Sequence, residues 1–219
     1  KMRNRIYYHV WSPAGSDAWR LLVDEQLRRV QASGCLSECD FKCVITGPQH
    51  ESIKEFISLY DWVDILECKG SQHEFEGATL KHLHRDCCNE EVSNVMYMHT
   101  KGITHVSSSS ERFRNVNSWR RMMEWGCIDR WSDNVKALES CNVSGVYWLT
   151  KPWSHFSGNF WWARADYISS LDSPVIPGND RHHYERWIGC RPESVHNMYH
   201  IDQDLYIHDI GLKYLKQNG

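Results

Sequence analysis

The segment NVMYMHTKG, residues 94–102, joins a short apolar run to a polar end. Residues 95–98 have the character of a buried strand, and His-Thr-Lys-Gly follows at 99–102. In open α/β sheets, ligands bind just past the carboxyl ends of the strands. A threonine, a lysine and a glycine at such an end could cradle an anion. The segment therefore predicts both a central strand and an anion site.

The first 105 residues alternate between strand-like and helix-like segments. We expect strands at residues 5–11, 41–46, 62–66 and 94–98. The first of the helices between them begins near Asp17, the second at a capping box that Ser52 opens, and the third with Thr79 as its N-cap. Such alternation is typical of a parallel sheet with flanking helices.

After residue 105 the pattern is less regular. We expect a helical region at 111–139 broken near Gly126, strands at 143–149 and 159–164, and a helix at 183–188. No internal repeat or linker interrupts the sequence. Residues 1–219 are therefore predicted to form one domain, with a regular first half (1–105) and an elaborated second half (106–219). Its ending, KQNG, carries no obvious stop signal, so we also consider that this domain is part of a longer chain.

Composition narrows the classes of function. The net charge is -3 with lysines and arginines scattered, which argues against a general nucleic-acid surface. No run approaches the roughly 20 apolar residues of a membrane span, so no transmembrane segment is predicted. The nine cysteines are an odd number without C-x-x-C spacing, which favours reduced thiols and a cytoplasmic location.

Three segments carry a resemblance to a known family. They are MHTKG at 98–102, HFSGNFWWARADYI at 155–168 and RHHYERWIG at 181–189. Together they resemble a group of bacterial and large-virus glycosyltransferases of the GT-A type, over about residues 5–190. In that group a strand ends in His-Thr/Ser-Lys-Gly, and Ser-Gly-Asn-Phe-Trp-Trp-Ala and Tyr-Glu-x-Trp-Ile segments follow. The stretch 74–80 also looks like that group's segment before the third helix.

The resemblance implies both a fold and an activity. The fold would be α/β, a GT-A-like (Rossmann-like) mixed central sheet of about six strands flanked by helices. The activity would be transfer of a sugar from a nucleotide-sugar donor, with a weak preference for a UDP-sugar, to a glycan acceptor. Residues 1–105 would form the donor half and residues 106–219 the acceptor half. The setting would be surface polysaccharide or capsid glycan synthesis, in the cytoplasm of a bacterium or of a virus-infected host cell.

The donor is expected across the carboxyl ends of the early strands. The residues predicted to surround its base and ribose are Tyr8, His9, Trp11, Thr46, Gly47, Glu76 and Thr79. Many GT-A enzymes carry Asp-x-Asp after the fourth strand to hold a metal, but residues 99–102 contain no carboxylate. We therefore expect Lys101 to supply the charge that stabilises the departing diphosphate, with Thr100 and Gly102 shaping the loop.

His99 is assigned a phosphate or sugar contact by the same argument. The structural alternative for this segment is a surface lysine in a turn, with His99 capping the strand. No metal site is predicted, although Mn²⁺ or Mg²⁺ on the diphosphate is compatible with a lysine-based site. The string Asp202-Gln203-Asp204 lies at the wrong chain position for a donor metal, and we favour a loop or helix-start role for it.

The second half supplies candidates for the acceptor side. Glu185 is the candidate general base, because inverting transfer needs a carboxylate to take the acceptor proton. Its structural alternative is an ion pair with Arg181 or Arg186. Gly158 would permit close approach of the backbone, and Asn159 offers a donor and an acceptor to sugar hydroxyls. The predicted acceptor-binding residues are Ser157, Gly158, Asn159, Trp161 and Trp162, with one of the two tryptophans as a sugar platform and the other in the core.

Three other functions stay open. A non-catalytic carbohydrate-binding module would use the tryptophans and have no need of Lys101. A sugar-phosphate nucleotidyltransferase would normally show a glycine-rich loop after the first strand, and Ser-Pro-Ala-Gly-Ser at 12–16 is a poor match. The domain could also bind the donor for a catalytic partner elsewhere in a longer chain.

Overall fold

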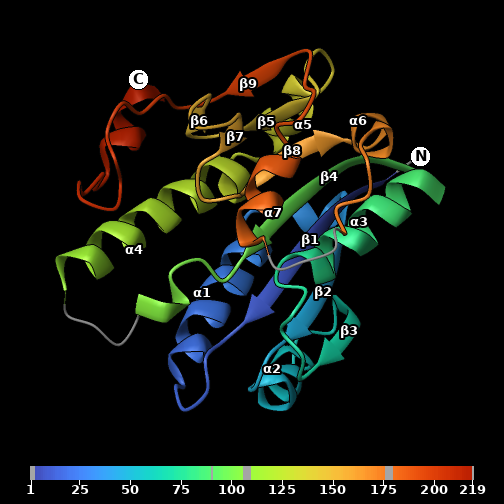
Figure 1. Ribbon diagram of the computed structural model, residues 1–219, viewed down its shortest axis with the longest axis vertical. Coiled ribbons are helices and arrows are strands. Elements are labelled where there is room, and N and C mark those ends of the chain that lie inside the picture. Colours follow the sequence, from blue (N-terminus) through green and yellow to red (C-terminus); the bar gives the residue numbers. More distant parts are fainter. Residues whose placement is uncertain (1–2, 90, 106–109, 176–179, 219) are drawn as a thin grey trace.

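The computed structural model describes residues 3–89, 91–105, 110–175 and 180–218. Within these residues a seven-stranded sheet has the order β3-β2-β1-β4-β8-β5-β9 (Figure 1). Its strands are β1 (Arg3–Trp11), β2 (Cys39–Thr46), β3 (Val63–Lys69), β4 (Val92–His99), β5 (Val143–Gly145), β8 (Trp161–Arg164) and β9 (Val195–Asn197). The predicted α/β fold with a mixed central sheet is confirmed. The seventh strand, β9, is a difference from the expected six, because this three-residue segment has too little pattern to predict.

Strand direction changes at one place in this sheet. The first four strands pair in parallel, and β8 pairs antiparallel with both β4 and β5. Because β9 is parallel to β5, β8 alone among these seven strands runs against the others. The chain leaves β1 toward β2 on one side, while β4 lies on its other side in register, His9 beside His99. Strand order reverses there, and the crevice outside such a reversal is the usual ligand position in open α/β sheets.

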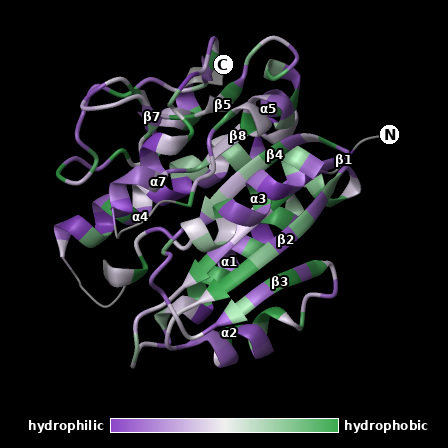
Figure 2. Ribbon diagram, turned by 45° about the vertical axis from the view of Figure 1, so that its right-hand side comes forward, coloured by the Kyte–Doolittle hydropathy of each residue, from purple (hydrophilic) through white to green (hydrophobic). Residues whose placement is uncertain are grey.

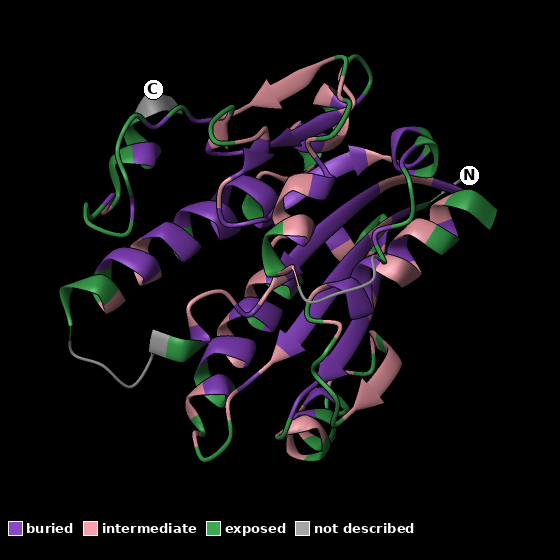
Figure 3. Ribbon diagram, viewed as in Figure 1, coloured by how far each residue is buried: buried purple, intermediate pink, exposed green. Residues whose placement is uncertain are grey.

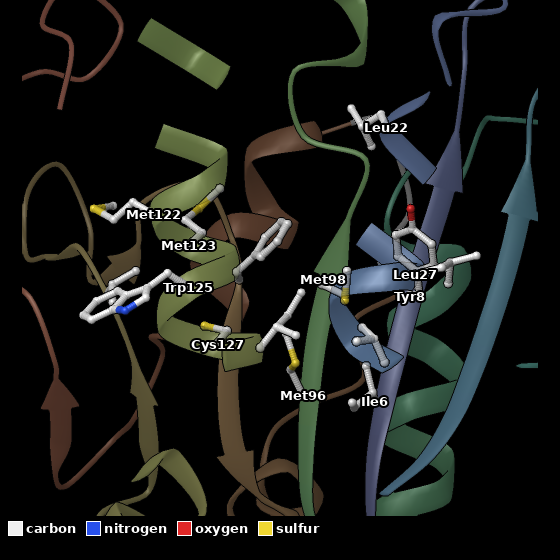
Figure 4. Close-up of a cluster of buried hydrophobic side chains, with 14 of the residues drawn as sticks. Ile6, Tyr8, Leu22, Leu27, Met96, Met98, Met122, Met123, Trp125 and Cys127 are labelled. Atoms are coloured by element: carbon white, nitrogen blue, oxygen red, sulfur yellow. The ribbon is translucent and has the colours of Figure 1, made fainter. Parts of the chain in front are cut away.

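Helices cover both faces of the sheet. On one face α1 (Ala18–Ala32) and α2 (His50–Ile57) pack with α4 (Glu111–Glu124), and on the other α3 (Gly77–Asn89) packs with α6 (Ala165–Ser170) and α7 (Arg181–Trp187). Alternate residues of each strand therefore enter different cores. Figure 4 shows the first core, where Tyr8 of β1 and Met98 of β4 lie close to Leu27 of α1.

The sheet is the apolar, buried centre of the molecule. The central strands carry the hydrophobic colours, while hydrophilic residues lie along the outer sides of the helices (Figure 2). Figure 3 shows the same strands as almost continuously buried, and β3 at the edge as half-buried. No helix in the described ranges combines the length and the apolar character needed to cross a membrane.

The predicted break near Gly126 is a π-helical turn, Trp125–Asp129, between α4 and α5 (Trp131–Ala137). Gly126 packs against Val146 so closely that an added Cβ would lie 2.4 Å from Val146 Cγ1. The turn also frees the Cys127 carbonyl, which accepts a 2.8 Å hydrogen bond from Trp162 Nε1. The break therefore lets α4 and β8 approach each other.

Several predicted boundaries are wrong for local reasons. The expected strand at 143–149 divides into β5 and β6 (Trp148–Leu149), because Tyr147 has a φ of 62°, and β6 pairs with β7 (His155–Phe156). Ser52 lies inside the first turn of α2 and does not cap it. Thr79 is likewise inside α3, since the Glu76 carbonyl accepts the N–H groups of Thr79 and Leu80. Short 3₁₀ turns at Cys35–Ser37, Ile103–His105 and Lys213–Asn218 were not predicted.

Candidate functional site

A cavity of about 230 Å³ opens past the carboxyl ends of β1 and β4, and we call it the β1/β4 cavity. The end of β4 points to the region between α4 and α7, and both helices contribute to its wall (Figure 1). The predicted site residues that line it are His9, Trp11, Thr46, Glu76, His99, Thr100, Lys101, Gly102 and Glu185. Residues on four elements and two loops thus meet where the strand order reverses.

The loop after β4 is fastened to β1 by one threonine. The Thr100 hydroxyl accepts from the Trp11 N–H at 3.2 Å and donates to the Trp11 carbonyl at 2.9 Å. The backbone N–H of Thr100 donates to the His9 carbonyl at 3.2 Å. Gly102 then takes a φ of 83°, and an added Cβ would lie 2.8 Å from Val116 Cγ1. Thr100 and Gly102 therefore determine where Lys101 lies.

His99 is held from both sides of its ring. Its Nε2 donates to the Gly158 carbonyl at 2.9 Å, and its Nδ1 lies 2.9 Å from Glu76 Oε1. Burial alone would raise the pKa of Glu76, but the charge of His99 and its hydrogen bond lower it to about 2. Glu76 is therefore a carboxylate, and each nitrogen of the His99 ring faces an oxygen atom. The two contacts fix the ring and the carboxylate against each other at the cavity floor.

Asn159 supports this pair and does not face a ligand. Its φ of 59° turns the side chain inward, where it is 1% exposed. Trp161 Nε1 donates to Asn159 Oδ1 at 2.8 Å, which fixes the amide so that Nδ2 donates to Glu76 Oε2 at 2.9 Å. The prediction that Asn159 binds sugar hydroxyls is therefore wrong, since both ends of its amide are already hydrogen-bonded.

The predicted sugar platform is also wrong. Trp161 and Trp162 are both 0% exposed and enter opposite cores, because helices cover both faces of β8. Gly158 is buried as well, and an added Cβ would lie 2.3 Å from Met123 Sδ. Ser157 is half-buried and is not among the residues that line the β1/β4 cavity.

Three of the predicted donor contacts lie behind the cavity wall. Tyr8 is 0% exposed on the α1 face, where its hydroxyl donates to Gln26 Oε1 at 2.6 Å. Gly47 lies so close to the Trp11 ring that an added Cβ would be 2.5 Å from Cδ1. Thr79 is buried and hydrogen-bonded to His9 Nδ1 at 2.7 Å. We therefore correct these three from ligand contacts to residues that support the wall.

Two charges in the cavity have no ion-pair partner within the described part of the chain. Lys101 contacts no carboxylate there, and its Nζ lies 4.1 Å from the centre of the Trp119 ring. Glu185, on α7, likewise makes no hydrogen bond or ion pair among the described residues. The alternative of a pair with Arg186 is not observed, because Arg186 binds Asp180. Thr46, whose hydroxyl is buried, also lines the cavity, and that hydroxyl has no hydrogen-bond partner among the residues that the structure describes.

This chain matches the model of one protein family. The sequence profile of DUF8361, a domain of unknown function, matches residues 7–176. The chain belongs to the DUF8361 family. No curated protein matches it. The floor of the cavity lies within the matched DUF8361 region, whereas Arg181, Glu185 and Tyr206 of its wall lie beyond that region.

Similar solved structures are remote from this DUF8361 chain. A 4-diphosphocytidyl-2C-methyl-D-erythritol synthase from Anaerococcus prevotii is 10% identical, with a TM-score of 0.46, and covers 95% of this chain and 92% of its own. A protein assigned as a nucleotide-diphospho-sugar transferase from Desulfovibrio desulfuricans is 11% identical, with a TM-score of 0.47, and covers 100% and 89%. A further 4-diphosphocytidyl-2C-methyl-D-erythritol synthase is 12% identical, with a TM-score of 0.39.

Sequence reasoning missed part of the wall of the DUF8361 site. Arg181, Tyr206, Gln72 and Phe75 line the cavity, and Gln72 Oε1 accepts from Trp11 Nε1 at 2.6 Å. The sequence offers Arg181 only as an ion-pair partner for Glu185. Tyr206 belongs to no motif and comes after the last segment with a recognisable helix or strand pattern.

The described residues contain no group of three His, Cys, Asp or Glu side chains close enough to hold a metal ion. Asp202 pairs with His200 at 2.6 Å, and Asp204 accepts from the Tyr206 N–H at 2.9 Å. These residues do not form a metal-binding set, so a role for Mn²⁺ or Mg²⁺ stays a prediction.

The buried His9 ring predicts acid sensitivity. Burial lowers the pKa of His9 to about 4, from 6.5 for an exposed imidazole. Between these values the unfolded chain binds a proton that the folded protein does not. The free energy of unfolding should therefore fall by about 3 kcal/mol as the pH drops from 7 to 4. In urea unfolding between pH 7 and 4, the free energy of unfolding of His9→Asn should depend on pH less than that of wild type, by about this amount. The control is His73→Asn, which removes an exposed imidazole with no ion pair among the described residues and should keep the wild-type slope. Equal slopes for both variants would contradict the assignment.

Proposed function

We propose that this protein is a glycosyltransferase that binds a nucleotide-sugar in the β1/β4 cavity and transfers the sugar to a glycan acceptor. The observation that carries the proposal is the pair of opposite charges, Lys101 and Glu185, that line one cavity without partners in the described chain. Unpaired charges in a partly enclosed site are costly unless a ligand uses them. A UDP-sugar is our first candidate donor, and surface polysaccharide or capsid glycan synthesis our first candidate setting.

Lys101 would stabilise the leaving group. When the bond between the sugar and the phosphate breaks, its electron pair leaves on the nucleoside diphosphate, and negative charge grows there. An ammonium group with free N–H donors forms strong charge-assisted hydrogen bonds to phosphate oxygens. The buried Thr46 hydroxyl has no hydrogen-bond partner in the described ranges, and we assign it to the nucleoside part of the same ligand.

Glu185 would act as the general base in an inverting transfer. The acceptor hydroxyl attacks the anomeric carbon, and its proton passes to the Glu185 carboxylate as the new bond forms. A carboxylate already engaged in an ion pair would be a weaker acceptor for that proton. Glu185 has no such pair among the described residues, whereas Glu76 is committed to His99 and Asn159.

The alternative of a carbohydrate-binding module now has less support. It depended on tryptophans as sugar platforms, and Trp161 and Trp162 are fully buried. Trp11 is half-buried at the cavity, beside a lysine that such a module does not need.

The test is calorimetric titration of the protein with UDP, GDP, CMP and UDP-sugars, each with and without Mn²⁺. We expect UDP to bind with a dissociation constant in the range of about 1 μM to 1 mM that is usual for enzyme substrates. If no nucleotide binds while free glycans do, the glycosyltransferase proposal is wrong. A requirement for Mn²⁺ would show that a metal assists Lys101.

A further inference from the structure

Lys101 is held by aromatic rings and not by a carboxylate. Its Nζ lies 4.1 Å from the centre of the Trp119 ring and 5.5 Å from that of Tyr206. The two rings meet edge to face, with centroids 5.0 Å apart and an interplanar angle of 88°. They therefore form a corner in which the ammonium lies against two π systems.

This kind of support has a chemical consequence. A carboxylate partner would neutralise the charge of Lys101 and occupy its N–H donors. A ring face attracts the charge through its quadrupole but accepts no conventional hydrogen bond, so the three N–H donors remain available. The corner therefore positions the lysine and leaves it able to bind an anion.

Both rings are themselves anchored. Trp119 is 2% exposed on α4 and packs edge to face on Tyr147. Tyr206 comes from the segment after β9, where its carbonyl accepts from the buried Asn115 Nδ2 at 3.1 Å and its N–H donates to Asp204. Tyr206 is 37% exposed and lines the β1/β4 cavity.

A second cation approaches the same ring. The guanidinium carbon of Arg112 lies 4.8 Å from the centre of the Tyr206 ring, and Arg112 has no carboxylate partner in the described chain. Lys101 lines the β1/β4 cavity, whereas Arg112 is not among the residues that line it. The Tyr206 ring therefore lies between the cavity lysine and a second cation beside the cavity.

We propose that Tyr206 is a positioning residue that, together with Trp119, holds Lys101 against a diphosphate or similar polyanionic group of the ligand. The inference rests on the proposed function for the identity of that ligand. It adds a specific role for a residue outside the matched family region, and it assigns the phosphate chain to the side of the cavity that Lys101 and Tyr206 line.

A double-mutant cycle tests the inference. Tyr206→Leu removes the ring face, and Tyr206→Phe keeps it and removes only a hydroxyl without a hydrogen bond among the described residues. We expect Tyr206→Leu to weaken UDP binding by roughly 3- to 30-fold, as for a partly desolvated cation–π contact. Tyr206→Phe should bind within about twofold of wild type, and Tyr206→Leu should have no further effect once Lys101→Ala is present. Ile207→Ala, at the exposed neighbouring position, should bind as wild type does.

Two further measurements separate the possible failures. The Lys101 Cε protons should show an upfield ring-current shift in the NMR spectrum that Tyr206→Leu reduces and Tyr206→Phe keeps, whether or not a nucleotide binds. Inorganic pyrophosphate is titrated beside UDP. If UDP binds equally to wild type and Tyr206→Leu, the inference is wrong and the proposed function stands. If only pyrophosphate binds, and needs Tyr206, the proposed function is wrong and the positioning role stands. If neither binds, both are wrong.

Discussion

Replacing Glu185 with glutamine should lower turnover by about 10²- to 10⁴-fold, the usual contribution of a general base. Glutamine keeps the shape of the side chain but cannot take a proton from the attacking hydroxyl. Binding of the donor should change by less than about threefold, because the base acts on the acceptor and not on the nucleotide. The measurement is UDP release from a UDP-sugar with water as the acceptor, beside calorimetric titration of UDP.

The matched control is Glu193→Gln. Glu193 is also a glutamate in the C-terminal part of the chain, but its side chain is exposed and it does not line the cavity. The Glu193→Gln variant should therefore release UDP as fast as wild type. If Glu185→Gln hydrolyses the donor as fast as wild type, the base is another group, and an inverting reaction through Glu185 is excluded.

The second large effect is expected in stability. Glu76→Gln should lower the free energy of unfolding by about 1 to 3 kcal/mol at pH 7, because it removes the carboxylate that two largely buried side chains contact. Glu76 accepts from His99 on one oxygen and from Asn159 on the other. A glutamine in the same place must turn its NH₂ group toward one of these donors. Urea unfolding monitored by circular dichroism gives the value.

Glu74→Gln provides the comparison two residues earlier. Glu74 pairs with Lys69 and Lys81 in a partly exposed network, so its loss should cost less than about 1 kcal/mol. Similar losses for the two variants would show that the His99–Glu76 pair is not the internal support described above. Because the pKa of Glu76 lies near 2, its contribution should persist down to about pH 4.5 and be lost only below that value.

The first half of the fold could be predicted because its signals are local. The apolar runs around Val44 and Met96 are bounded by glycine, proline and polar residues, and the intervening helices have one apolar face. The second half could not be predicted as well. Strands such as β7 and β9 are two or three residues long. Each is defined by its partner strand, β6 for β7 and the distant β5 for β9. No periodicity can be recognised in so few residues.

Some residues of the candidate site could be predicted from the sequence and others could not. The ends of β1 and β4 identified His9, His99 and Lys101, because the carboxyl edge of a parallel sheet is a general property of the fold. Period-two alternation placed Trp161 and Trp162 on opposite faces of the strand. The sequence did not show that both of these faces of β8 are buried in separate cores. Tyr206 is placed at the cavity by contacts with Asn115 and Trp119 of α4, and no sequence motif predicts these contacts.

The place of β8 in the sheet has a consequence for how the chain assembles during synthesis. Strands β2, β3 and β4 each leave the ribosome after a strand with which they pair has already been made. Strand β5 does not, because both of its partners, β8 and β9, are made after it. Until β8 has emerged and inserted beside β4, β5 has no native strand to join. The apolar edge of β4 meanwhile stays open, which makes this interval the moment when a nascent chain is most exposed to aggregation or in need of a chaperone.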